Sequence, residues 1–254
     1  MRRYTMLPLL FVLFWTTPLY SQTISLKTDF QDTASKVIKD ASGKYVGICI
    51  DLMNLIEKNS GFKFIYPKDF SPLKRIEADL GSGDIDVYFA LIKNPAREKF
   101  ASFIEPLYTI DYILIAKADE KADIKTIDDL KTIGKNGKIL TVGGSTIVNY
   151  IEKTLGLPAD SSAATVNQNL SKLLAGRERF MIYQDLSILY EMTKPEYKDK
   201  FKIYPLSLQK EELWLVTSKK QPDSTGKSLQ AVIKKLKASG DWDKIVSKYT
   251  SITK

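Results

Sequence analysis

The chain has 254 residues, of which 38 are Lys or Arg, 30 are Asp or Glu and none is His, so its formal net charge is +8. Without histidine, imidazole general-base catalysis is excluded and a transition-metal site is not expected. The lysines are scattered rather than gathered in runs, which indicates a solvated surface and no nucleic-acid partner, with an anionic partner or ligand as the alternative. The single Cys49 cannot form an internal disulfide and is expected to be a core thiol.

Residues 1–21 have the order of a secretory signal peptide. Arg2 and Arg3 precede an apolar stretch at 6–15, and the polar segment that follows ends at Ser21, a small residue suited to cleavage. The stretch is shorter than the about 20 apolar residues that cross a bilayer, and a retained signal anchor is the alternative. Cleavage lowers the formal charge from +8 to +6 and leaves about 233 residues, enough for two lobes. We therefore expect export to the periplasm.

Strand-like and helix-like periods alternate through the first half of the remaining chain. Strands are predicted at 23–27, 45–49, 62–66 and 85–91, and one helix at 50–59. A second helix is predicted to follow Ser71 as its cap, with Pro72 at its first position. This β-α-β-α order predicts a sheet flanked by helices.

The second half repeats this pattern. Strands are predicted at 138–142, 164–166 and 180–183, and helices at 147–155, 170–175 and 186–192. Two similar blocks predict an α/β fold of two lobes, each a central sheet flanked by helices. The extended stretches 112–117 and 206–216 are expected to form a two-strand hinge, and a helical tail at 228–249 to pack back on the first lobe. The predicted boundaries are 22–112 with 208–254 for lobe 1 and 113–207 for lobe 2.

Three polar sites follow predicted strands. Arg97 presents a donor fork that matches a carboxylate, with a solvated arginine on a helix from Pro95 as the alternative. The turn 143–146 (GGST) can accept an anion or simply cap a helix. Asp185 can pair with a ligand ammonium or cap its own helix. Ligands bind at such strand ends in open α/β sheets, so Arg97 and Asp185 on different lobes are expected to hold the two ends of a zwitterion.

Seven motifs follow one another over nearly the whole length after residue 21. They are 43–52 (GKYVGICIDL), 80–86 (LGSGDID), 94–97 (NPAR) with 106–108 (PLY), 126–130 (TIDDL), 142–146 (VGGST), 183–185 (YQD) and 240–249 (GDWDKIVSKY). In this succession the chain resembles family 3 of the extracellular solute-binding proteins, the amino-acid-binding type that serves ABC importers. The resemblance implies the two-lobed, type II periplasmic-binding fold.

The resemblance also implies roles for individual residues. Arg97 matches the arginine that binds the α-carboxylate of the ligand, and Ser145 and Thr146 match hydroxyls that bind the same group. Asp185 matches the acid that takes the α-ammonium, helped by a backbone carbonyl near Ala90.

Two positions depart from the family pattern. Asn94 stands where the family usually has Thr, and the Pro-aromatic pair that often covers the ligand side chain is missing, so that Phe30 alone remains as a candidate. The predicted aromatic walls of the pocket are Phe30, Phe89, Tyr108 and Tyr183, with ordinary core packing as the alternative for each.

The sequence therefore predicts a monomeric periplasmic binding protein without cofactor, metal or catalytic activity. It is expected to close on a small polar ligand, an amino acid or related carboxylate, and then dock on the membrane permease of an ABC importer. Two alternatives remain open. One is an enzyme resembling the periplasmic dehydratases, with Glu105 or Asp185 as the acid, and the other is a ligand sensor for a membrane receptor.

Overall fold

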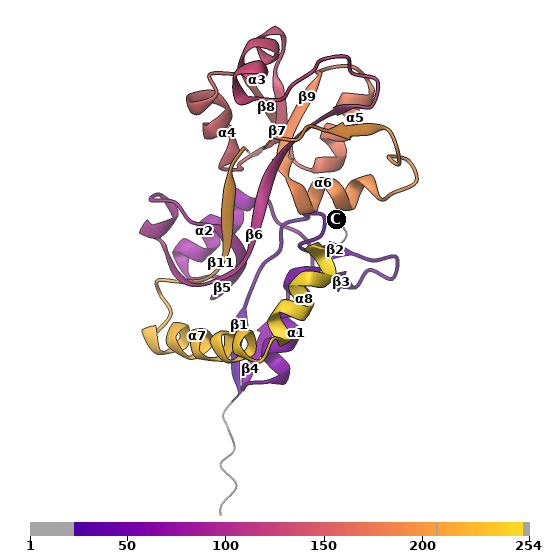
Figure 1. Ribbon diagram of the computed structural model, residues 1–254. Helices are drawn as coiled ribbons and strands as arrows, with labels where there is room; N and C mark the ends of the chain where they lie inside the picture. The colour runs from indigo at the N-terminus through magenta and orange to yellow at the C-terminus, as the bar shows by residue number, and fades with distance from the viewer. Residues whose placement is uncertain (1–22, 207, 251–254) are drawn as a thin grey trace, which may run out of the picture.

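The computed structural model describes residues 23–206 and 208–250, and Figure 1 shows them as two lobes joined by two long strands. The joining strands are β6 (Ala101–Lys117) and β11 (Lys210–Ser218), which pair antiparallel. They contain most of the two stretches that the sequence predicted as connections. The predicted signal peptide lies outside the described residues. Within the described part, no helix combines the length and the apolar character needed to cross a membrane.

Lobe 1 carries both ends of the described chain. Its strands are β1 (Ile24–Lys27), β2 (Ile38–Lys39), β3 (Tyr45–Val46), β4 (Phe62–Ile65) and β5 (Val87–Ile92), and its helices are α1 (Ile48–Lys58), α2 (Leu73–Ser82), α7 (Asp223–Ala238) and α8 (Asp241–Thr250). β1 and β4 pair in parallel, and α1 buries Ile48, Leu52 and Ile56 at helical spacing. In Figure 1, α7 runs along the lower side of this lobe and α8 rises beside α1 toward lobe 2, so that the helical tail packs back on lobe 1 as predicted.

Lobe 2 lies at the other end of the two joining strands. Its strands are β7 (Ile139–Val142), β8 (Ala159–Ala163), β9 (Phe180–Gln184) and β10 (Phe201–Ile203), and its helices are α3 (Ile127–Ile133), α4 (Ile147–Asn149), α5 (Val166–Leu174) and α6 (Asp185–Met192). β7 pairs in parallel with both β8 and β9. Helices flank these strands, as the alternating pattern predicted.

A single sheet runs through both lobes. Among the described residues it has seven strands in the order β5-β11-β6-β9-β7-β8, with β10 also paired to β6. The 17 residues of β6 explain this continuity, because its first part pairs with β11 and its last part with β9 and β10. The sequence predicted a central sheet in each lobe. In the structure the hinge strands join β5 of lobe 1 and the strands of lobe 2 in one sheet, whereas β1–β4 and β2–β3 form separate two-stranded sheets in lobe 1.

Three local predictions were wrong. The strand predicted at 45–49 is confined to its first two residues, because β3 ends at Val46 and α1 starts at Ile48. Ser71 does not cap α2, whose N-cap is Pro72. The strand predicted at 164–166 is displaced, since β8 ends at Ala163 and Thr165 caps α5 with its hydroxyl. Short apolar runs fit a strand and the start of a helix equally well, which explains the first and third errors.

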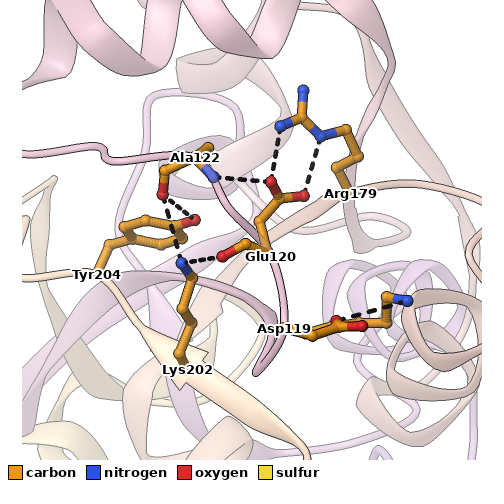
Figure 2. A network of polar contacts seen from close by, with 7 residues as sticks. Asp119, Glu120, Ala122, Arg179, Lys202 and Tyr204 are labelled. Carbon is orange, nitrogen blue, oxygen red and sulfur yellow. Dashed lines mark hydrogen bonds and ion pairs between the residues drawn. The ribbon is translucent and has the colours of Figure 1, made fainter.

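A polar network ties the end of β6 to β9 and β10 (Figure 2). The Glu120 carboxylate accepts hydrogen bonds from Arg179 Nε at 3.0 Å, from Arg179 Nη2 at 2.8 Å and from the Ala122 N–H at 2.9 Å. The Lys202 ammonium donates to the backbone carbonyls of Glu120 and Ala122, and the Tyr204 hydroxyl donates to the latter at 3.1 Å. Chiefly through the Arg179 hydrogen bonds, the pKa of Glu120 is lowered to about 2.

Replacing Glu120 with glutamine is expected to lower the free energy of unfolding at neutral pH by about 1 to 2 kcal/mol, a value reduced for solvent screening of the partly exposed Arg179. Because the folded-state pKa is depressed, the contribution of Glu120 is present above its unfolded pKa and is lost as the pH falls toward 2. Denaturant unfolding at neutral and at low pH measures the difference. Asp119→Asn, at an exposed neighbouring carboxylate, is the control, and an equal loss in both variants would contradict this account.

Candidate ligand-binding site

A small cavity lies between the lobes. Its volume is about 30 Å³, and five residues predicted for the site line it: Ala90, Arg97, Ser145, Thr146 and Tyr183. The space suits one or two waters rather than an amino acid. Tyr183 also lines a neighbouring cleft of about 600 Å³ that both lobes border. A ligand must therefore separate the lobes, or move side chains, before it can occupy the smaller cavity.

Arg97 is buried at the start of a short 3-10 helix, Arg97–Lys99, that follows β5, rather than solvated. After this fully buried strand the chain turns, and the Asn94 side chain accepts the Arg97 backbone N–H at 2.9 Å. The Arg97 side chain is only 6% exposed. Its Nη1 donates to the Ile92 carbonyl at 2.9 Å, and its Nε donates to Glu77 Oε1 at 2.8 Å, with Nη2 2.8 Å from the same oxygen. A guanidinium has five N–H donors, so both terminal nitrogens retain hydrogens for a further acceptor.

Ala90 is a bulged residue in the middle of β5. Leu91 pairs with Trp214 of β11 and Phe89 pairs with Leu215, so that Ala90 is skipped in the register. Its φ of 69° is left-handed, which costs an L-residue about 1 to 2 kcal/mol. Bulges release backbone groups from the ladder and occur next to binding sites. The strained backbone at Ala90 therefore lines the cavity. This is the position where the family resemblance implied a backbone carbonyl that helps to bind the α-ammonium of the ligand.

The turn before α4 presents two hydroxyls from lobe 2. Ser145 donates to the Val142 carbonyl at 2.8 Å, and Thr146 Oγ1 lies 3.3 Å from the Tyr112 hydroxyl of β6. Neither hydroxyl caps α4. The alternative that this turn simply caps a helix with its side chains is therefore wrong. Ser145 and Thr146 both line the cavity.

Asp185 opens α6 beside the site. Its Oδ1 accepts the Leu186 N–H at 2.7 Å, and burial, with a smaller effect of Asp111, raises the pKa of this carboxyl. It is not among the residues that line the small cavity or the adjacent cleft. The structure therefore does not bring Asp185 to the same cavity wall as Arg97, and its pairing with an ammonium stays a prediction.

Of the four aromatic candidates, Tyr183 alone reaches the cavity among the residues described here. Phe30 packs edge-on against two tyrosines at centroid distances of 4.8 and 5.2 Å, and Phe89 packs in the same way on Phe64. The Tyr108 hydroxyl lies 3.9 Å from the Cys49 sulfur in the core. The three side chains are 2 to 6% exposed, as ordinary core aromatics are.

Lys36 also lines the cavity, although the sequence patterns did not predict a role for it. It lies in an irregular segment without helical or strand periodicity, before β2. The sequence did contain a feature that could have drawn attention to Lys36, because it is the only basic residue between Lys27 and Lys39. Within the described ranges, no group of three or more His, Cys, Asp or Glu side chains is placed to hold a metal ion.

Two lobes, two connecting strands and a cavity between them define a bilobal binding protein. Residues 28–252 match the profile of the bacterial extracellular solute-binding proteins, family 3, and the chain belongs to this family. It is a solute-binding protein of the extracellular class.

Individual relatives are distant in sequence. The chain is 25% identical over 212 residues to a probable histidine-binding protein of Neisseria gonorrhoeae, covering 83% of this chain and 76% of that one. It is 27% identical over 219 residues to the ABC transporter glutamine-binding protein GlnH of Bacillus subtilis (strain 168), covering 82% and 74%. A solved mutant of ArgBP from T. maritima superposes with a TM-score of 0.76 at 19% identity, covering 89% of this chain and 95% of that one. The last likeness supports the fold.

Proposed function

We propose that this protein captures a small polar ligand, an amino acid or a related carboxylate, between its lobes and delivers it to an ABC importer. The observation that carries the proposal is that Arg97 from lobe 1 and Ser145 and Thr146 from lobe 2 line one cavity. A buried guanidinium with donors to spare, facing two hydroxyls, suits a carboxylate. The two relatives are named as histidine-binding and glutamine-binding proteins, which supports an amino acid as the ligand.

Hinge closure follows from this division of the site. Ligand contacts on both lobes favour the closed state, and the difference in affinity between the open and closed states sets the population shift. The Ser187 hydroxyl of lobe 2 already donates to the Ala34 carbonyl of lobe 1 at 3.1 Å, so closure adds ligand contacts to an existing bridge. Export by the predicted signal peptide places this cycle in the periplasm, where the closed monomer meets a membrane permease.

Binding is favoured over the dehydratase-like alternative by the position of Glu105. This carboxylate pairs with Lys237 of α7 at 2.9 Å and lies outside the residues that line the two interlobe spaces. Glu105, one of the two acids considered for catalysis, therefore stabilises the packing of α7 on β6. The other alternative, a ligand sensor for a membrane receptor, uses the same cleft and the same ligand-binding step as import.

Replacing Arg97 with alanine is expected to weaken binding of the cognate ligand about 100-fold, because a buried charge-assisted contact is removed. A thermal-shift screen of the common amino acids first identifies that ligand, since a compound that binds only the native state raises the melting temperature. Titration calorimetry then compares wild type with Arg97→Ala.

Two further variants make this experiment decisive. Arg97→Ala leaves Glu77 without its partner, so the double variant Arg97→Ala/Glu77→Ala removes both charges and keeps the fold testable. Arg75→Ala, at an exposed arginine on the same helix as Glu77, is the control and should bind as wild type does. Wild-type affinity in folded protein without Arg97 would overturn the site.

A further inference from the structure

The interlobe cavity contains a second cation. Lys36 and Arg97 both line it, and the charge of Arg97 disfavours that of Lys36. Arg97 is balanced by Glu77, whereas the Lys36 ammonium has neither a hydrogen bond nor an ion pair with any residue that the structure describes. Burial, with a smaller effect of Arg97, lowers the pKa of Lys36 to about 8, so the side chain is still mostly charged at neutral pH.

The backbone of Lys36 is held rigidly. Its N–H donates to the Thr33 carbonyl at 3.0 Å, and its own carbonyl accepts the Cys49 N–H at 3.1 Å. The preceding Ser35 carbonyl accepts the Ile48 N–H at 2.9 Å, so that the first N–H groups of α1 hold this segment. Ser35 has a left-handed φ of 66°, and strain of this kind persists where the surrounding structure enforces it. The lysine is thus presented by a fixed frame rather than by a mobile loop.

No carboxylate lines the cavity among the described residues. Asp29 is buried and precedes Lys36 by seven residues in the sequence. Its Oδ1 accepts the Phe30 N–H at 2.6 Å, and its side chain does not line the cavity. Burial raises the pKa of Cys49 to about 11, so its thiol stays neutral. Glu191 and Asp32 border the larger cleft, where Lys194 pairs with Glu191 at 2.7 Å and burial raises the pKa of Asp32. Once Glu77 has balanced Arg97, one positive charge remains for a ligand to compensate.

We propose that the ligand is an acidic amino acid, whose α-carboxylate meets Arg97 and whose side-chain carboxylate meets Lys36. The assignment rests on the proposed function and specifies its substrate class. An acidic amino acid carries a net charge of −1, which complements the uncompensated ammonium. A neutral side-chain amide leaves the partly buried Lys36 without a counterion, and a cationic side chain adds repulsion.

Titration calorimetry at neutral pH with L-glutamate, L-aspartate, L-glutamine and L-asparagine tests the assignment. Wild type is expected to bind one of the two acids about 100-fold more tightly than its amide. In Lys36→Gln that preference is expected to vanish through weaker binding of the acid, with thermal unfolding as the check of the fold. Lys44→Gln makes the same charge change at an exposed lysine eight residues further on and is expected to keep the preference.

The pH dependence gives an independent readout. Affinity of wild type for the acid is expected to fall as the pH rises from about 7 to about 9.5, because free Lys36 loses its proton in this range, while Lys36→Gln shows no such fall. Equal wild-type affinity for acid and amide, tighter binding of lysine or arginine, or an unchanged preference in Lys36→Gln would overturn the acidic ligand and leave the proposed function intact. Full affinity without Arg97 would instead overturn the proposed function.

Discussion

Replacing Gly47 with alanine is expected to lower the free energy of unfolding by about 3 to 5 kcal/mol. Gly47 precedes α1 with φ 128° and ψ 173°, a combination that is essentially confined to glycine. A Cβ at this position would lie 2.3 Å from the Lys36 carbonyl oxygen and 2.7 Å from the Lys36 carbonyl carbon. Both are backbone atoms held by α1, so the clash cannot be relieved by turning a side chain.

The same substitution is expected to weaken ligand binding, because the segment that must move carries Lys36 into the cavity. Denaturant unfolding and calorimetry on the same protein measure the two effects. Gly43→Ala is the matched control, since Gly43 has φ 81° but open space around its Cβ, and it should cost only about 1 kcal/mol. Equal stability of the two variants would show that the contact with Lys36 is not the cause.

The sequence predicted those parts of the fold that have a regular period. The strands that became β5, β7 and β9, and the extended stretches that became the last part of β6 and most of β11, are apolar runs of strand length, so their position follows from pattern alone. Arg97 was found for the same reason, because it follows one of these runs. That β6 and β11 join β5 of lobe 1 to the strands of lobe 2 in one sheet was not predictable, since strand pairing depends on contacts between residues far apart in the chain.

The parts that the sequence did not predict are irregular. The run that contains Cys49 was placed in a strand, whereas α1 starts one residue before it, and Lys36 was not considered at all. Both errors have one physical source, because the backbone of 35–36 caps α1 and Gly47 permits the close approach. No local propensity encodes such a contact. The roles of Asp185 and of the aromatic candidates other than Tyr183 depended on side-chain direction, which spacing leaves open.

Replacing Trp242 with alanine is expected to lower the free energy of unfolding by about 3 to 5 kcal/mol, because a large aromatic side chain leaves a cavity in the core. Trp242 is 1% exposed at the start of α8, and its Nε1 donates to the Leu107 carbonyl of β6 at 2.8 Å. The chain reaches α8 only after β11 and α7, so this side chain fixes the tail on lobe 1 beside one of the hinge strands.

The tryptophan variants also separate packing from hydrogen bonding. Trp242→Phe keeps most of the apolar volume and leaves the Leu107 carbonyl without this donor, which costs about 1 to 3 kcal/mol. Denaturant unfolding should therefore rank wild type above Trp242→Phe and Trp242→Ala last, and equal losses in the two variants would assign the whole effect to the hydrogen bond. Since neither Trp242 nor Leu107 lines the interlobe cavity, folded Trp242→Phe should retain the wild-type ligand preference. A changed preference would mean that the packing of α8 on β6 is coupled to the closed state of the lobes.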